Sequence, residues 1–88
     1  MITSMRREDA EKVTILLSKV TDAGEFNRQA SLTKFGIEAQ SGSYIVDAKS
    51  LMGLFSLDLS KPIELAMLTD DDKQKNDFKY RINKFIVA

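Results

Sequence analysis

Two hydrophobic periodicities alternate along this chain of 88 residues, and their order limits the possible folds more than any other feature. Apolar residues recur at every second position in residues 13–18, 37–40, 44–48 and 63–68. This alternation predicts four short strands, each with one buried face. Residues 78–86 instead have apolar side chains at i, i+4, i+7 and i+8, which predicts a helix with one buried stripe: Phe78, Ile82, Phe85 and Ile86. The chain must therefore bury strand faces and helix stripes in a shared core.

A second helix is predicted after the first strand. Asp22, with Glu25 three residues later, matches the capping box of a helix that begins at this point. Gly24 and Asn27 lower its helix propensity, so this is the weakest element of the pattern. Its apolar stripe is thin: Ala23, Phe26, Ala30, and Thr33 or Lys34.

Turn and capping residues mark the middle of the chain. The run Ser41-Gly42-Ser43 separates two strands and predicts a hairpin. Ser50 is a favourable N-cap, so a helix of one or two turns is expected to begin at Leu51. Pro62 has no backbone N–H and therefore suits the first position of the following strand.

Three consecutive carboxylates, at residues 70–72, precede the last helical stripe. Negative charge at a helix amino terminus complements the helix dipole and contributes about 0.3–1 kcal/mol per charge. Three consecutive side chains do not converge on one ion, and no EF-hand spacing follows, so we expect capping here and no metal site. The basic residues of this helix are expected to form a solvated face: Lys75, Lys79, Arg81 and Lys84.

The element order β-α-β-β-α-β-α predicts an α+β fold with two layers. A four-stranded, mainly antiparallel sheet would pack against three helices on one face. Residues 1–10 are polar and have no period, so we expect a flexible N-terminal arm, with translation beginning at Met1 or Met5. Residues 11–88 would form a single domain.

The composition excludes several kinds of chemistry. The sequence contains no histidine and no cysteine, which excludes imidazole catalysis, disulfides and thiolate metal sites. Acid–base or metal chemistry would have to rest on carboxylates, Lys, Tyr or the backbone. We expect no enzymatic activity and no cofactor. Lys plus Arg and Asp plus Glu both total 13, and this balance argues against a nucleic-acid partner. The longest apolar stretch, residues 51–59, is too short for a membrane span, and no signal peptide is evident, so a cytoplasmic location is expected.

Residues 46–57 (VDAKSLMGLFSL), together with the element order, resemble the HPr family. HPr is the phosphocarrier of the bacterial sugar phosphotransferase system. The resemblance extends over about residues 13–86 and is strongest over residues 41–65. It implies the HPr-like open-faced sandwich.

The same resemblance reveals a departure at the phosphocarrier site. HPr proteins carry the phosphoryl group on a histidine at the amino end of the first helix, closely followed by an Arg and a Pro. The corresponding stretch here includes Lys19, Thr21 and Asp22, and the sequence has no histidine. The resemblance therefore implies a degenerate site that cannot form phosphohistidine. Thr21 or Asp22 could accept a phosphoryl group only through different donor chemistry, and the alternative is that Asp22 simply caps the helix.

The resemblance also points to the short helix after Ser50. Ser50 matches the serine that HPr kinase phosphorylates in some bacteria, and a helix amino terminus tolerates a phosphate. The alternative is that Ser50 is only an N-cap, worth about 1 kcal/mol. In HPr-like proteins this helix presents an apolar patch to partners. Here the patch would consist of Leu51, Met52 and Phe55, flanked by Lys49, and the alternative is core packing.

The sequence thus predicts an HPr-like regulatory or protein-docking module that acts through the surface from Ser50 to Ser56. Its partner would be a transcriptional regulator, a kinase or an enzyme of the phosphotransferase system. One alternative is a member of the phosphocarrier family that uses a non-histidine site, and another is an orphan structural domain that shares the fold. We expect no nucleic-acid or membrane partner, and either a monomer or a weak dimer.

Overall fold

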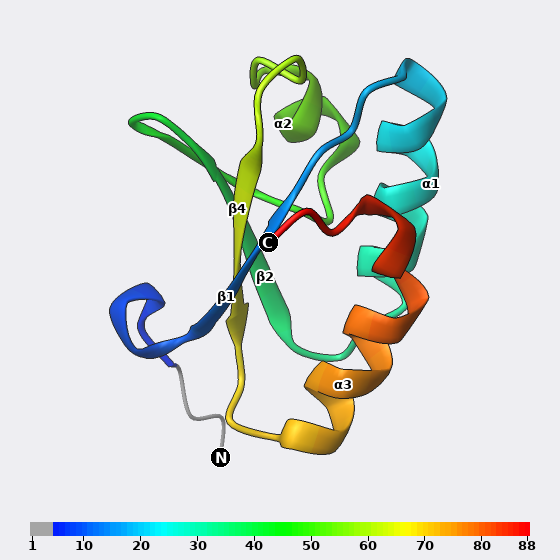
Figure 1. Ribbon diagram of the computed structural model, residues 1–88. Helices are drawn as coiled ribbons and strands as arrows, with labels where there is room; N and C mark the ends of the chain where they lie inside the picture. Colours follow the sequence, from blue (N-terminus) through cyan, green and yellow to red (C-terminus); the bar gives the residue numbers. More distant parts are fainter. Residues whose placement is uncertain (1–4) are drawn as a thin grey trace.

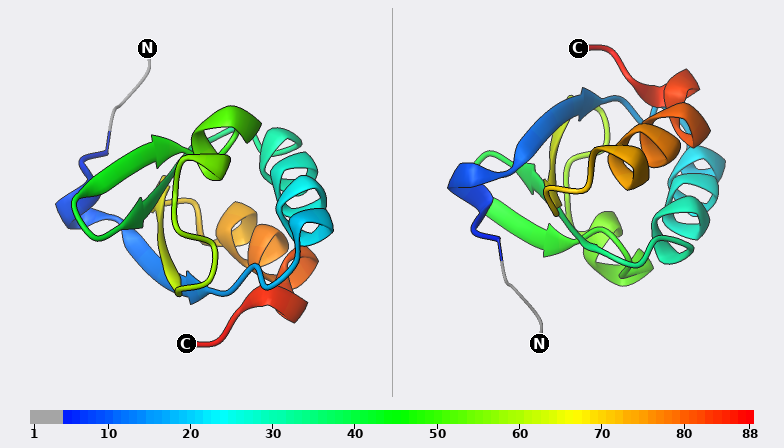
Figure 2. Two further views of the ribbon diagram at one scale, coloured as in Figure 1. Left: turned by 90° about the horizontal axis from the view of Figure 1, so that it is seen from above. Right: turned by 90° about the horizontal axis from the view of Figure 1, so that it is seen from below.

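The computed structural model describes residues 5–88, which form a sheet covered on one face by helices (Figure 1). The strands are β1 (Glu11–Ile15), β2 (Gly36–Ser41), β3 (Tyr44–Asp47) and β4 (Ile63–Leu68). They lie in the order β1-β4-β2-β3, and every neighbouring pair is antiparallel. The helices are α1 (Val20–Ser31), α2 (Leu51–Phe55) and α3 (Asp72–Arg81). Both views of Figure 2 show them on the same side of the sheet. The predicted α+β sandwich is confirmed.

The core lies between the sheet and the helices. Ile63, Leu65 and Met67 alternate along the central strand β4 and are fully buried, as the period of two predicts. Phe78 of α3 contacts Phe26 of α1 and Phe35 edge-on or tilted, with ring centroids 6.3 and 6.0 Å apart. These contacts join α1, α3 and the sheet into one core.

The β2–β3 hairpin forms at the predicted turn. Ser41 pairs with Tyr44, so Gly42 and Ser43 make a two-residue connection. Gly42 has a φ of +60° and no other described residue has a positive φ. A positive φ at the first central position alone is the type II′ pattern, which favours glycine.

The start of α1 differs from the prediction. Lys19 is the N-cap, and Asp22 is the third helical residue, where its Oδ2 accepts a hydrogen bond from the Lys19 backbone N–H at 3.2 Å. The predicted Asp22 N-cap with Glu25 is therefore wrong. An acidic residue in the first turn can accept a hydrogen bond from the backbone N–H of the N-cap residue, or it can itself be the N-cap. Sequence spacing alone does not distinguish the two arrangements. Glu25 instead pairs with Lys84 at 2.7 Å.

The stripe of α1 is confirmed in its first part. Ala23, Phe26 and Ala30 are fully buried. The helix ends at Ser31, so Thr33 and Lys34 do not extend the stripe. The Thr33 hydroxyl donates to the Ala30 carbonyl at 2.8 Å and closes the last turn.

The C-terminal segment also departs from the predicted helix. α3 ends at Arg81, and a 3-10 turn, η2 (Asn83–Phe85), follows. The chain then runs along β1, where the Val87 N–H donates to the Thr14 carbonyl and the Thr14 N–H to the Ala88 carbonyl, both at 2.8 Å. The continuous helix to residue 86 is wrong because these bonds to the edge of β1 compete with further helical turns. Phe85 still reaches the core.

Part of the N-terminal segment lies against the sheet. Residues 1–4 of the expected flexible arm lie outside the described residues. Arg7–Asp9 form a 3-10 turn, η1, next to β4 on the sheet face opposite the helices (Figure 1). Arg7 Nη1 lies 3.3 Å from Glu38 Oε1 of β2, and Ala10 is buried.

Candidate functional site

α2 begins at Leu51 with Ser50 as its N-cap, as predicted. Ser50 has extended backbone angles, and its Oγ accepts a hydrogen bond from the Gly53 N–H at 3.1 Å. This bond satisfies one of the backbone donors that a helix leaves free at its amino end. Ser50 is exposed to solvent.

The loop that leads into α2 is fixed by contacts with α1 and with the segment after it. The Asn27 side-chain amide donates to the Ala48 carbonyl at 3.2 Å. The Lys49 ammonium donates to the Thr33 carbonyl at 3.0 Å, so this half-buried charge is tethered to the α1–β2 connection. The Asp47 carboxylate accepts from the Lys49 backbone N–H at 2.9 Å. These bonds orient α2 relative to α1.

The apolar side chains of α2 divide between core and solvent. Leu54 is fully buried, whereas Leu51 and Phe55 are exposed and Met52 is 83% exposed. At about 100° per residue, positions 51, 52 and 55 fall within one arc of about 100° on the helix. We call this set the α2 surface: Leu51, Met52 and Phe55.

Gly53 lies on the opposite side of α2, against β3. A Cβ on Gly53 would lie 3.2 Å from the Val46 Cβ and 3.3 Å from Ser50 Oγ. A side chain at this position would press on the strand and on the cap. Glycine therefore allows α2 to lie close to β3 while its other side faces solvent.

One exposed apolar residue near this site was missed by the sequence reasoning. Val20, the first residue of α1, is 72% exposed. It lies seven positions before Asn27 and hence on the same side of α1, the side that contacts the lead-in to α2. The amino end of α1 and α2 lie at the same end of the molecule (Figure 1). The sequence did contain a signal for this residue, because Val20 is apolar and lies outside the buried stripe of its own helix.

The expected degenerate phosphocarrier site lies at the amino end of α1. Lys19 and Thr21 are exposed, and Asp22 is half-buried. The Asp22 carboxylate accepts hydrogen bonds from the Lys19 backbone N–H at 3.2 Å and from the Ser18 hydroxyl at 3.4 Å. Asp22 therefore stabilises the start of the helix.

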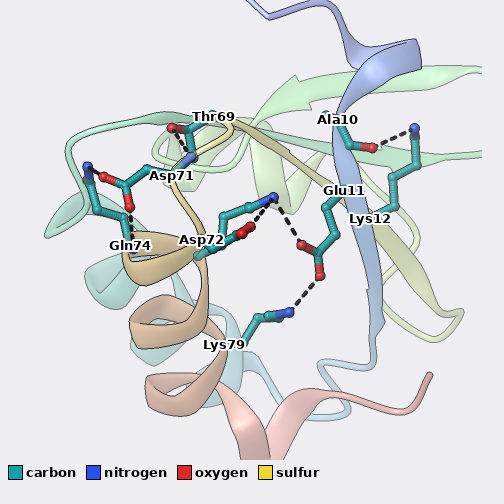
Figure 3. Close-up of polar contacts among 9 residues, drawn as sticks. Ala10, Glu11, Lys12, Thr69, Asp71, Asp72, Gln74 and Lys79 are labelled. Atoms are coloured by element: carbon teal, nitrogen blue, oxygen red, sulfur yellow. Dashed lines mark hydrogen bonds and ion pairs between the residues drawn. The ribbon is translucent and has the colours of Figure 1, made fainter.

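Displaced pKa values occur in groups with structural contacts elsewhere. Hydrogen bonds from Lys79 and Lys75 lower the pKa of Glu11 (Figure 3). The Ser60 hydroxyl and backbone N–H lower the pKa of Asp58, in the loop after α2. These carboxylates remain charged because of their partners, which is the behaviour of structural groups.

Within residues 5–88, no group of three acidic residues is arranged to hold a metal ion. No helix in the same part of the chain has the length and hydrophobicity needed to cross a bilayer.

Comparison with known proteins connects this geometry to a solved structure. Neither protein-family models nor curated protein sequences match the chain. The structure of HPr-C-His from Thermoanaerobacter tengcongensis matches with a TM-score of 0.67 and 26% sequence identity, over 84% of this chain and 92% of that chain. The four-stranded antiparallel sheet with three helices on one face is therefore an HPr-like fold.

Proposed function

We propose that this protein is an HPr-like docking module that binds a protein partner through the α2 surface and does not carry phosphohistidine. The observation that carries the proposal is the exposure of Met52, at 83%, beside the exposed Leu51 and Phe55. Methionine adapts to irregular partner surfaces, and aromatic residues commonly anchor interfaces. Leu54 already holds α2 in the core, so the fold does not need Met52 for packing.

The rigidity of α2 supports this role. The Ser50 cap, the Asn27 bond to the Ala48 carbonyl and the close approach of Gly53 to Val46 hold the helix in place. A preformed surface loses less conformational entropy on binding than a flexible one. The likeness to an HPr structure favours a partner related to the phosphotransferase system: a transcriptional regulator, a kinase or an enzyme of that system.

Affinity purification from the native host tests the proposal. The baits are the wild type, Met52→Glu and Tyr80→Glu. Tyr80 is a matched control because it is 82% exposed on α3, and the variant adds the same charge. We expect Met52→Glu to lose a partner that Tyr80→Glu retains. Equal capture by all three baits would support the orphan structural domain instead.

A phosphocarrier that uses a non-histidine site is the alternative within the same family. Thr21 and Asp22 are the residues available at the amino end of α1, but the Asp22 carboxylate is engaged in capping. Incubation with phosphoenolpyruvate and the first enzyme of the phosphotransferase system distinguishes the two functions. Intact-mass analysis that shows a phosphoryl adduct, lost in Asp22→Asn or Thr21→Val, would replace the docking proposal with this alternative.

We also propose Ser50 as a site of regulatory phosphorylation. Its hydroxyl is exposed at the edge of the α2 surface, and a phosphate would add a charge of about −1.5 to −2 beside apolar side chains. Such a charge would change which partners the surface accepts. HPr kinase with ATP should add one phosphate, which Ser50→Ala abolishes and Ser56→Ala preserves. Modification that survives in Ser50→Ala would exclude this site.

A further inference from the structure

A groove of about 490 Å³ lies between α3 and the connection from α1 to β2. Both of these segments are at the end of the helical layer opposite α2 (Figure 1). The groove is therefore separate from the α2 surface. Its lining includes Leu32, Lys34, Phe35, Lys73, Asp77 and Arg81.

The apolar part of the groove comes from the α1–β2 connection. Leu32 is exposed, and Phe35 is largely buried with its ring 6.0 Å from Phe78 in an edge contact. The core thus holds the Phe35 ring in place. Leu32 lines the same groove and is exposed to solvent. Together they form a small apolar contact area in the groove.

The basic side chains of the groove have N–H donors that are free to bind an acidic ligand. Lys34 and Lys73 are exposed, and neither has a carboxylate within 4.0 Å in residues 5–88. Arg81 Nε donates to Asp77 at 3.1 Å, and its Nη1 donates to the Gln29 carbonyl and side chain at 3.0 and 2.8 Å. Arg81 Nη2 has no partner in the described part of the chain.

The guanidinium of Arg81 is therefore already positioned before any ligand arrives. Its Cζ lies 5.6 Å from the centre of the Phe78 ring, which adds a cation–π contact. A fixed, planar guanidinium loses little entropy when it binds a further carboxylate. The groove thus presents two exposed ammonium groups and one fixed donor.

The nearby carboxylates offset part of this charge, because Asp71 interacts with Lys73 and Asp77 pairs with Arg81. Asp77 is paired with Arg81 at 3.1 Å. Asp71 accepts two hydrogen bonds from Gln74, at 3.2 and 2.8 Å, and Asp72 lies 3.3 Å from the Lys75 ammonium. Neither Asp71 nor Asp72 lines the groove. Lys34, Lys73 and Arg81 outnumber Asp77, the one carboxylate of the groove lining, so the lining carries a net positive charge.

We infer that this groove binds an acidic peptide segment of a protein partner. One apolar side chain of the segment would pack on Leu32 and Phe35, and flanking carboxylates would pair with Lys34, Lys73 and Arg81. The charge complementarity favours an acidic segment and selects against basic ones. The groove is open to solvent, so a peptide segment can enter it. The inference does not depend on the function of the α2 surface.

Selection from a random dodecapeptide display library tests this inference. Wild-type protein should enrich peptides with at least two acidic residues near an apolar one. In Lys34→Glu/Lys73→Glu the affinity of an enriched peptide should fall about tenfold or more, the size of effect expected at the centre of an interface. Lys12→Glu/Lys61→Glu is the matched control, since it changes two exposed lysines outside the groove by the same charge. Its affinity should stay within about twofold of the wild type.

Amide chemical shifts in an NMR titration locate the bound peptide. Changes should be confined to residues 32–35 and 73–81, and Met52→Glu should bind the peptide as the wild type does. In the affinity purification, loss of a partner by Met52→Glu tests the α2 surface and leaves the peptide groove unaffected. The inference is overturned if no acidic peptide is enriched, if the shifts map elsewhere, or if both double variants weaken binding equally. The inference is also overturned if an RNA dodecamer binds the groove as tightly as the enriched acidic peptide does.

Discussion

The ammonium of Lys79 donates to Glu11 Oε2 at 2.6 Å, which joins α3 to the first residue of β1 across 68 positions of sequence. The other oxygen, Oε1, lies 3.2 Å from the Lys75 ammonium. Lys75 is buried, so Glu11 neutralises a charge that has little access to water. This contact fastens the C-terminal helix to an edge strand of the sheet.

Replacement of Glu11 should therefore destabilise the protein. In Glu11→Gln, Lys75 retains Asp72 at 3.3 Å, and Lys79 loses its carboxylate partner. Because Glu11 is partly exposed, we expect a loss of about 1 kcal/mol in the free energy of unfolding. Urea denaturation measures it, and Glu64→Gln, at an exposed position of β4, is the control. Equal stability of the two variants would contradict a role for this contact.

The same contact predicts a pH dependence. Hydrogen bonds from Lys79 and Lys75 lower the pKa of Glu11 below its ordinary value of 4.5. A carboxylate with a lower pKa in the folded state stabilises the protein above its unfolded pKa, and the effect is lost as pH falls through the folded pKa. The partner Lys75 has a raised pKa and stays charged throughout this acidic range.

Thermal unfolding of wild type and Glu11→Gln from pH 7 to pH 3 checks this. The Tm difference between them should be constant above about pH 5 and should shrink as pH falls below 4.5. Asp58 and Asp71, whose pKa values are also lowered, are present in both proteins and cancel in the difference. A Tm difference that does not change with pH would mean that Glu11 acts through packing alone.

Loss of the Ser50 cap should weaken α2. Ser50→Ala removes the acceptor of the Gly53 N–H and should cost about 1 kcal/mol, whereas Ser50→Asp, which also caps well, should restore most of it. Denaturant titration gives the global effect, and hydrogen exchange of the Gly53 amide gives the local one. Faster exchange at Gly53 in Ser50→Asp than in Ser50→Ala would contradict the capping geometry.

Two helical glycines should respond to alanine in opposite directions. A Cβ at Gly53 would lie 3.2 Å from the Val46 Cβ, whereas a Cβ at Gly24 would have nothing within 4 Å. Gly24→Ala should stabilise by about 0.5–1 kcal/mol through helix propensity. Gly53→Ala should destabilise by about 1 kcal/mol because crowding against a strand outweighs that gain. Stabilisation by both changes in urea denaturation would show that α2 can shift away from β3.

The predictions that succeeded depend on residues close together in the chain. The Gly42 turn, the Ser50 cap and the alternation of Ile63, Leu65 and Met67 each involve only a few neighbouring positions. The alternation determines which face of β4 is buried, whereas the position of β4 between β1 and β2 is a property of the tertiary structure.

The failures involve contacts between distant residues. Lys75 belongs to the basic face that the sequence predicts to be solvated, yet it is buried against Glu11. The helical stripe correctly marks Phe85 as buried, but bonds from β1 to residues 85–88 end the helix early. Periodicity reports which side chains are apolar, and it contains no information on which backbone groups a distant strand edge will bind.

The candidate site shows the same division. The sequence alone determined that imidazole chemistry is absent, that a helix begins after Ser50 and that four apolar side chains follow within five residues, because these are properties of composition and local pattern. Only the tertiary structure decided that Leu54 enters the core while Met52 faces water, and that Lys34, Lys73 and Arg81 meet at one groove. The reason is physical: exposure and charge clustering depend on which elements pack together, and that is a property of the whole fold.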